Sequence, residues 1–265
     1  MSSPTIHPSA IVHPGAEIGN NVFIGPYCII GEKVKISDNN KFHASVYIEG
    51  KTTIGNGNEF FPYSCIGTPP QDLTYKNEDT ELIIGNDNVF REGVNIHRAT
   101  LKQDLKTIVG NNNYFMSHVH VAHDCNIGNE VILASQCAIA GHVTIHDRVS
   151  MGGQCGVTPF MTVGKNVFVG GATTIDKDVP HYTTCFGNRI RLKGINIIGL
   201  KRKGIAKDII AEVVDFYRLM ESSAFSPKAF LEREEFMNEY SENPVIKEIA
   251  GFIRDSQIGI PPFMS

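Results

Sequence analysis

Residues 115–144 read FMSHVH-VAHDCN-IGNEVI-LASQCA-IAGHVT, a run of six-residue groups that each begin with a large apolar residue. The same period runs from Ile6 to Ile66, resumes from Ile84 to Ile96, and continues from Val109 to Ile175. The fifth place of each group is mostly small or β-branched. Six residues are too few for a helical repeat but suit one short strand and a turn, so the groups are expected to stack and bury their apolar faces on one another.

This period predicts the fold class, an all-β solenoid whose short parallel strands stack into three flat sides. The 26 repeats from Ile6 to Ile175 correspond to about nine coils of about 18 residues. Turns that need a positive φ are expected at the Gly-Asn pairs 19–20, 55–56, 85–86, 110–111 and 128–129.

Two segments interrupt the period and are expected to form loops. The first lies near 68–82, is polar, and leaves 18 residues between Ile66 and Ile84. Because that is a whole coil, this loop is expected to replace three sides without shifting the phase. The second lies near 100–107, where 13 residues separate Ile96 from Val109, so it is expected to bulge outward. Long loops on a rigid repeat scaffold are usually functional.

The repeat ends after Pro180, which predicts two domains: a β-helix over 1–190 and a small helical domain over 191–265. Apolar residues at helical spacing predict a helix over Lys207–Met220. Two further helices are expected to start at Ser226-Pro227 and Asn243-Pro244, since a capping side chain followed by proline is typical of a helix N-terminus.

Composition and cysteine spacing argue against a secreted protein, a membrane-spanning protein and a zinc-ribbon or redox protein with Cys-x-x-Cys pairs. The net charge is −4, the six cysteines include no Cys-x-x-Cys pair, and the N-terminus lacks the basic and apolar segments of a signal peptide. No apolar run is long enough to cross a bilayer. We expect a soluble cytoplasmic protein with no membrane insertion, no nucleic-acid partner, no cofactor and no metal. The cysteines in the fifth place of a repeat are expected to be small core residues: Cys28, Cys125, Cys137 and Cys155.

One stretch concentrates positive charge. Residues 179–207 contain no aspartate or glutamate. Such a run attracts phosphate groups or an acidic protein surface, although a solvated edge between two domains would also explain it. The basic residues of this stretch are Arg189, Arg191, Lys193, Lys201, Arg202, Lys203 and Lys207.

The densest group of reactive side chains comprises His118, His120, His123 and Asp124, with His142 following in a later repeat. His123 and Gly141 are 18 residues apart. They should therefore stack on neighbouring coils, which places an imidazole beside a backbone N–H. A general base next to an unobstructed backbone donor suits acyl transfer, because the donor stabilises the oxyanion of the tetrahedral intermediate.

Asp124 could orient His123 and stabilise its protonated form. Adjacent residues of a strand point to opposite faces, so this contact is a question for the structure. The remaining histidines are interpreted as structural or solvent-facing: His7, His13, His43, His97, His146 and His181.

Several short motifs together resemble the UDP-N-acetylglucosamine O-acyltransferases of lipid A biosynthesis, and the resemblance covers essentially the whole chain. The motifs are Pro-Gln-Asp-Leu (70–73), Asn-Ile-His-Arg (95–98), Ala-His-Asp-Cys-Asn-Ile-Gly-Asn (122–129), Ala-Gly-His-Val (140–143), Lys-Asp-Val-Pro (177–180) and Asn-Ile-Ile-Gly-Leu-Lys-Arg (196–202). The resemblance implies a left-handed parallel β-helix that works as a homotrimer with active sites between subunits. It also implies transfer of a 3-hydroxyacyl group from acyl carrier protein to the glucosamine 3-hydroxyl.

The resemblance further implies roles for individual residues. His123 matches the general base, Asp124 its orienting partner, and Gly141 the glycine whose N–H faces the thioester carbonyl. Residues that match substrate contacts are Asp72, His120 and His142 around the sugar and diphosphate, Gly171 along the acyl groove, and Asn196 and Arg202 on the nucleotide side. Gln71 and Gly153 are also expected to bind substrate. The basic stretch is expected to bind the acidic carrier protein, and the residues expected to make these contacts are Arg189, Arg191, Lys193, Lys201 and Lys203.

The chain departs from the family pattern on the acceptor side. Thr158-Pro159 stands where the family usually has His-Gln, and the other departures are Thr74 for a frequent Lys, Ile198 for a frequent Glu, and Lys203 for Arg. These changes leave open an acceptor with a 3-amino group, and also a non-catalytic paralogue that binds a nucleotide sugar. Two further alternatives are another hexapeptide acyltransferase and a metal-dependent hydratase of the carbonic anhydrase type, with His118 and His123 as zinc ligands.

Overall fold

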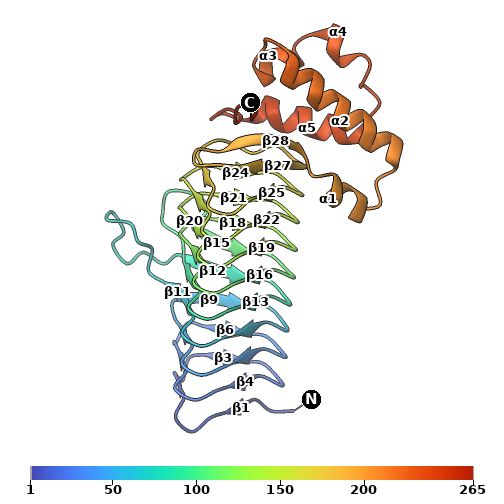
Figure 1. The fold of residues 1–265 in the computed structure, drawn as a ribbon. Helices are drawn as coiled ribbons and strands as arrows, with labels where there is room; N and C mark the ends of the chain where they lie inside the picture. The colour runs from blue at the N-terminus through green and yellow to red at the C-terminus, as the bar shows by residue number, and fades with distance from the viewer. Residues whose placement is uncertain (1, 265) are drawn as a thin grey trace.

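The computed structural model describes residues 2–264, and in it three parallel sheets form a prism that carries a group of helices at one end (Figure 1). The strands of the prism are β1 Thr5–Ile6, β2 Ile11–Val12, β3 Glu17–Ile18, β4 Phe23–Ile24, β5 Ile29–Ile30, β6 Lys35–Ile36, β7 Lys41–Phe42, β8 Tyr47–Ile48, β9 Lys51–Ile54, β10 Glu59–Phe60, β11 Cys65–Thr68, β12 Glu81–Ile84, β13 Val89–Phe90, β14 Asn95–His97, β15 Lys106–Val109, β16 Tyr114–Phe115, β17 His120–Val121, β18 Asn126–Ile127, β19 Ile132–Leu133, β20 Ala138–Ile139, β21 Thr144–Ile145, β22 Ser150–Met151, β23 Gly156–Val157, β24 Thr162–Val163, β25 Phe168–Val169, β26 Thr174–Ile175, β27 Thr183–Phe186 and β28 Arg191–Ile195.

Consecutive strands belong to different sides of the prism. Sheet A takes every third strand from β1 to β25, sheet B from β2 to β26, and sheet C from β3 to β24. Stacked strands pair in register, so that Ile6 lies beside Ile24 and Ile127 beside Ile145. The predicted solenoid of 26 short strands is therefore confirmed.

Each repeat buries its first and fifth residues and turns at its third and fourth. The first residues are buried from Ile24 onward, and the fifth residues Val22, Cys28 and Cys125 are also buried. In most repeats the fourth residue adopts a left-handed backbone conformation, as at Asp124, whose φ is 59°. The six cysteines are all free thiols, and the four that were interpreted as core residues, Cys28, Cys125, Cys137 and Cys155, are buried.

The predicted reason for the Gly-Asn pairs is wrong. The positive φ falls two residues after the glycine, for example at Asn112 rather than at Gly110. Gly110 is instead required by close stacking, because a Cβ there would lie 2.5 Å from the carbonyl oxygen of Gly128 on the next coil. The asparagine after it joins a ladder, since the side-chain oxygen of Asn129 accepts hydrogen bonds from Asn111.

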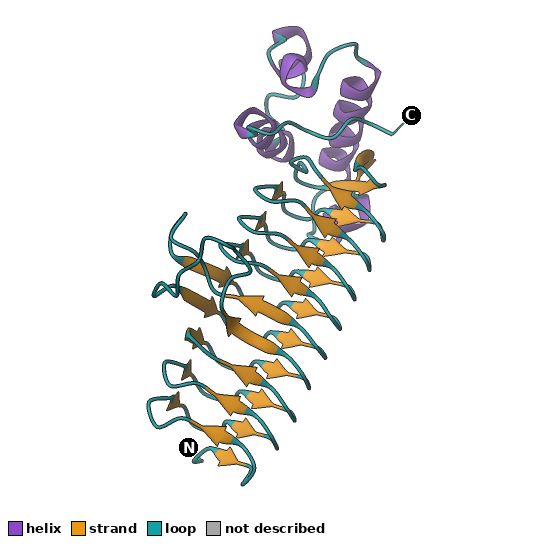
Figure 2. Cartoon of the chain, turned by 90° about the vertical axis from the view of Figure 1, so that its left-hand side faces the viewer, coloured by secondary structure: helices purple, strands orange, loops and turns teal. Residues whose placement is uncertain are grey.

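Both interruptions of the period are loops at the corner between sheets B and C, on one side of the prism (Figure 2). The first loop, residues 69–80, joins β11 to β12, and the second loop, residues 98–105, joins β14 to β15. The expectation that the first loop replaces three sides is wrong. Its flanking strands occupy consecutive sides of one coil, and Ile84 stacks directly on Ile54. The insertion lengthens a single corner, which accommodates extra residues without breaking the stack.

The helical region begins after sheet A is completed by β27 and the antiparallel β28, so the predicted domain boundary at 190 falls between these two strands. Ser226 and Asn243 cap α3 and α5 with their side chains, as predicted. None of the helices in residues 2–264 is long and apolar enough to cross a membrane. The helices are α1 Ile197–Arg202, α2 Lys207–Ser222, α3 Pro227–Leu231, α4 Glu234–Met237 and α5 Pro244–Asp255.

Candidate active site

The candidate site lies at the corner between sheets B and C, where three successive coils and both loops meet. The turn after β17 carries His123 and Asp124, the turn after β20 carries Gly141 and His142, and the turn after β23 carries Phe160. Because each corner stacks on the one before it, residues separated by one coil become neighbours. The two loops leave the same corner on the preceding coils and reach the same cluster.

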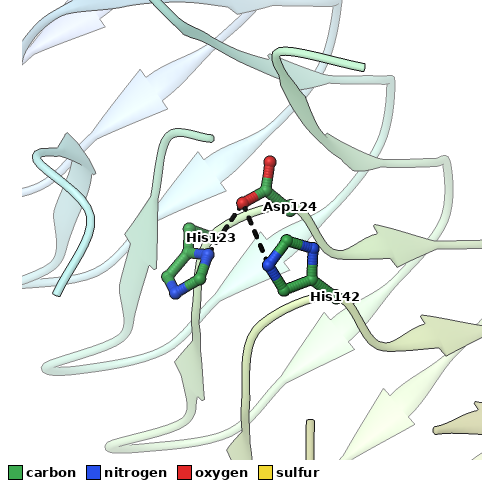
Figure 3. Close-up of side chains that lie close together, drawn as sticks. All are labelled: His123, Asp124 and His142. Atoms are coloured by element: carbon green, nitrogen blue, oxygen red, sulfur yellow. Dashed lines mark hydrogen bonds and ion pairs between the residues drawn. The ribbon is translucent and has the colours of Figure 1, made fainter. Parts of the chain in front are cut away.

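Asp124 links two imidazoles (Figure 3). Its Oδ2 lies 2.7 Å from Nδ1 of His123 and 3.7 Å from Nε2 of His142. With Nδ1 donating to the carboxylate, the free lone pair of neutral His123 is on Nε2, at the other end of the ring. The predicted contact between His123 and Asp124 is therefore present. It is possible because both residues lie in a turn instead of a strand.

The Asp124 carboxylate is enclosed and fully paired. Its side chain has 0% exposure, and Thr100 donates to it from the backbone N at 3.1 Å and from Oγ1 at 2.7 Å. Burial alone would raise the pKa of the Asp124 carboxyl, but the hydrogen bonds from His123 and Thr100 hold that pKa below its usual value. Asp124 is therefore a carboxylate that can stabilise a positive charge on His123.

Gly141 lies against the face of His123. A Cβ on Gly141 would be 2.5 Å from Cε1 and 2.9 Å from Nε2 of His123, so only glycine fits without moving the ring. The N–H of this turn position makes no hydrogen bond among residues 2–264, and prolines occupy the equivalent place at Pro26, Pro62 and Pro159. An unpaired backbone donor thus stands beside the unpaired Nε2.

Asp72 comes from the first loop and lies next to the imidazole. Its Oδ2 is 4.0 Å from Nε2 of His123 and 2.6 Å from Nζ of Lys102, which belongs to the second loop. Its Oδ1 accepts from the backbone N and the hydroxyl of Thr74, at 2.8 and 2.7 Å. The Lys102 ammonium, together with these bonds from Thr74, holds the pKa of the Asp72 carboxyl well below its usual range.

His142 is held by residues of two other segments. Its Nδ1 lies 2.9 Å from Oε1 of Gln103 in the second loop. The ring of Phe160 stacks on it, with centroids 4.5 Å apart and planes inclined by 5°. Burial lowers the pKa of His142, while the Asp124 carboxylate opposes that effect. Sequence reasoning missed Gln103 and Phe160, because neither residue type signals a site on its own.

Two further histidines line sheet B beside the corner. His120 and His97 lie on neighbouring strands, β17 and β14, with ring centroids 5.0 Å apart, and burial lowers the pKa of each. His97 was interpreted as structural or solvent-facing, yet it is 6% exposed and contacts the first loop through the carbonyl of Pro69, 2.8 Å from its Nδ1. Its buried Nε2 has no hydrogen-bond partner within residues 2–264. Register alone could have revealed this residue, since β14 stacks directly beneath β17.

The other predicted site residues lie elsewhere in the chain. His118, Gly153 and Gly171 occupy turns between sheets A and B, and Gln71 is exposed in the first loop. Asn196 and Arg202 line a pocket of about 960 Å³ between sheet A and α1, on the side of the prism opposite the candidate site. Asn196 also caps α1 by accepting from the N–H of Gly199. The residues predicted to bind the carrier protein are all exposed: Arg189, Arg191, Lys193, Lys201 and Lys203.

His123, Asp124 and His142 also offer ligand atoms within 4.8 Å of one another, a spacing that a metal ion could use. The shared Oδ2 of Asp124, however, already accepts from His123 and from the Thr100 hydroxyl. A hydrogen-bonded acid–base group accounts for every contact of this carboxylate.

Comparisons with known proteins show the family to which the chain belongs. A family model described as UDP N-acetylglucosamine O-acyltransferase, domain 2, matches residues 178–261, and a model of six bacterial transferase hexapeptide repeats matches residues 1–32. The acyl-[acyl-carrier-protein]–UDP-N-acetylglucosamine O-acyltransferase of Thermodesulfovibrio yellowstonii is 43% identical over 255 residues, which cover 96% of this chain and 98% of that protein. The chain belongs to this family of acyltransferases.

Solved structures extend the likeness to the whole fold. The crystal structure of LpxA from Bacteroides fragilis, a UDP-N-acetylglucosamine acyltransferase, is 40% identical with a TM-score of 0.92, covering 97% of this chain and 99% of that one. LpxA from Acinetobacter baumannii is 38% identical with the same TM-score and the same coverage. The predicted family and the predicted β-helix followed by a helical region are therefore confirmed.

The departures from the family pattern fall on two parts of the molecule. Thr158, Pro159 and Phe160 form the corner directly after that of Gly141 and His142, and the Thr158 hydroxyl donates to the carbonyl of Ile175. Ile198 lies in the sheet A pocket, where it is 65% exposed. Thr74, by contrast, contacts Asp72 directly.

Proposed function

We propose that the chain transfers a 3-hydroxyacyl group from acyl carrier protein to the 3-hydroxyl of UDP-N-acetylglucosamine, the first step of lipid A biosynthesis, with His123 as general base. The role of His123 is supported by the different surroundings of its two ring nitrogens, of which only Nδ1 is hydrogen-bonded. Nδ1 donates to the buried Asp124 carboxylate. Nε2 lies next to Gly141, and neither Nε2 nor the N–H of Gly141 makes a hydrogen bond among residues 2–264. This arrangement supplies a base and an oxyanion donor at one point.

The reaction then proceeds in two proton-coupled steps. Nε2 of His123 takes the proton of the acceptor hydroxyl while that oxygen bonds to the thioester carbonyl carbon. The carbonyl oxygen becomes an oxyanion, which the N–H of Gly141 stabilises, and Asp124 stabilises the imidazolium. The intermediate collapses, the carbon–sulfur bond breaks, and the thiolate of the carrier leaves with the proton from His123. Ester and thiol are the products.

Acceptor binding is assigned to two surfaces. Asp72, His120 and His142 would hold the sugar and diphosphate at the corner, while Asn196 and Arg202 would hold the nucleotide. Because sheet A lies opposite the corner between sheets B and C, one chain cannot present both surfaces to one substrate. We therefore include a cytoplasmic homotrimer in the proposal, with each site shared by two subunits and the exposed basic stretch facing the carrier protein.

The test is a transfer assay with 3-hydroxyacyl carrier protein and UDP-N-acetylglucosamine, run for wild type and for His123→Ala. The variant should lose about 10²–10⁴-fold in kcat, the usual contribution of a general base, while trimer formation and melting temperature stay the same. Equal turnover by wild type and variant would refute the role of His123.

A 3-amino analogue of the acceptor remains the second candidate substrate. Thr158 and Pro159 stand beside His142 where the family usually has His-Gln, and Ile198 adds an apolar side chain to the sheet A pocket. Competition between the hydroxyl and amino sugars in one assay decides between them. Turnover of the amino sugar alone would make these substitutions a specificity change, and binding without turnover of either sugar would favour the non-catalytic paralogue.

A further inference from the structure

The second loop touches three polar residues of the candidate site within four consecutive positions. Thr100 donates to Asp124 at 2.7 Å, Lys102 donates to Asp72 at 2.6 Å, and Oε1 of Gln103 lies 2.9 Å from Nδ1 of His142. The three partners come from three different segments: the turn after β17, the first loop and the turn after β20. One short segment therefore joins the first loop, which lies outside the repeat, to two stacked turns of the repeat.

The contacts of Lys102 and Gln103 are directed at side chains that have few other hydrogen-bond partners among residues 2–264. The Asp72 side chain is 12% exposed, and beyond the second loop its hydrogen bonds come from Thr74 on its own loop. The Lys102 side chain is 48% exposed and makes its ion pair at the surface end of the site. Among residues 2–264, the ring of His142 is hydrogen-bonded only to Gln103. The stacked ring of Phe160 fixes the plane of this imidazole.

We propose that Lys102 and Gln103 are positioning residues of the transfer reaction, with Lys102 fixing Asp72 and Gln103 fixing the orientation and tautomer of His142. This inference rests on the proposed function and adds to it two residues that act through their partners. Holding a catalytic or binding group within a fraction of an ångström of its working position matters because small misplacements reduce rates strongly.

The direction of each bond gives a specific consequence. Lys102 can only donate, so it holds Asp72 as a carboxylate and leaves the Oδ2 edge directed toward His123. With its amide oxygen facing the ring, Gln103 accepts from Nδ1–H of His142. Neutral His142 then has its free lone pair on Nε2, which lies 3.7 Å from Oδ2 of Asp124, too far for a hydrogen bond between the two.

The first test measures coupling between Lys102 and Asp72 in the transfer assay. Lys102→Met should lower kcat/KM about tenfold, Lys102→Arg should recover most of that loss, and Lys102→Met in an Asp72→Asn background should change kcat/KM less than about twofold. Asp104→Asn in the second loop and Lys106→Met at the start of β15 change nearby exposed charges and serve as controls that stay near wild type. A Lys102→Met loss of equal size with and without Asp72 would overturn the positioning role and assign Lys102 to a substrate contact.

The second test needs no turnover. Nitrogen NMR of histidine-labelled protein, with the His142 signals identified from a His142→Gln variant, reports which ring nitrogen carries the proton. We expect the Nδ1–H form in wild type and a mixed population in Gln103→Leu. An unchanged tautomer in Gln103→Leu would overturn the role of Gln103. This readout is independent of His123, so it stands even if His123→Ala retains full activity and the proposed base is wrong.

Discussion

Asp124 occupies the fourth place of its repeat, where most repeats adopt a left-handed backbone conformation. Its φ of 59° is one that aspartate and asparagine tolerate better than most residues. This turn also frees His123 and Asp124 from the alternation of a strand, so both side chains can lie on the same side and bond at 2.7 Å. A fold requirement and a catalytic requirement are therefore met by one residue type at one position.

Gly141 is the residue at which the site has the least room. We expect Gly141→Ala to lower kcat by about 10²-fold, because the added Cβ overlaps the ring of His123 and misplaces it by a fraction of an ångström or more. Melting temperature should change little. The measurement is kcat of the purified variant beside that of Gly251→Ala, where a Cβ meets nothing within 4 Å. Wild-type kcat in Gly141→Ala would show that His123 does not need its observed position.

His181 predicts a pH dependence of stability. Burial lowers its pKa to about 4, and its Nδ1 accepts from the backbone N–H of Lys165 at 2.8 Å. The groups around it are His146, Lys165, Lys203 and Glu248. As pH falls below about 6.5, the usual pKa of histidine, the unfolded chain gains a proton that the folded chain refuses, so stability decreases until about pH 4.

Between pH 7 and pH 5 the free energy of unfolding should accordingly fall by an amount on the order of 1 kcal/mol. The melting temperature should fall with it. His181→Asn keeps an acceptor near the Lys165 N–H but does not titrate in this range, so its melting temperature should vary less with pH. If the melting temperatures of both proteins depended on pH in the same way across this range, His181 would not be the titrating group.

At the scale of elements, two-residue strands are too short to be stable alone, and side-chain ladders help to hold them in register. Asn88 is completely buried and accepts from the N–H of Asn113, while its Nδ2 donates to Asn58 and to the carbonyl of Gly110. The ladder of asparagines thus satisfies backbone groups at turns that the strands leave unpaired.

Asn88→Ala should destabilise the protein by about 2–4 kcal/mol, because it leaves several buried polar groups without partners. Chemical or thermal unfolding measures this directly. Asn126→Ala, at an exposed position of β18, is the matched control and should stay within about 0.5 kcal/mol of wild type. A similar small change in Asn88→Ala would mean that the ladder contributes little to stability.

For the whole molecule, the positions of the two substrate surfaces predict complementation. His123→Ala and Arg202→Ala are each expected to be poorly active at low UDP-sugar concentration. If a site uses His123 of one subunit and Arg202 of another, trimers formed by refolding an equal mixture should regain about a quarter of wild-type activity, because a quarter of the shared sites contain both intact residues.

The control is a mixture of the two proteins that has not been unfolded, in which subunits have not exchanged. No recovery after verified exchange would mean that His123 and Arg202 do not serve a common site. Recovery would support the shared site of the proposed trimer.

The sequence by itself determined the solenoid, since an apolar residue every six positions can be buried only if successive units stack. It also placed Gly141 beside His123, because one coil separates them and stacking is local, whereas it left the contact between His123 and Asp124 open. The N-caps of α3 and α5 were equally predictable, since a capping side chain followed by proline is a local signal.

Only the tertiary structure decided what the loops do. Sequence spacing suggested that the first loop replaced a coil, whereas strand pairing shows an insertion at one corner. The contacts of Lys102 and Gln103 depend on that corner, because loop residues follow no period and their partners lie in other segments. The placement of Asn196 and Arg202 opposite the site likewise follows from which side of the prism α1 covers. The period carries information about neighbours one coil apart, and non-local contacts made by loops and helices lie outside it.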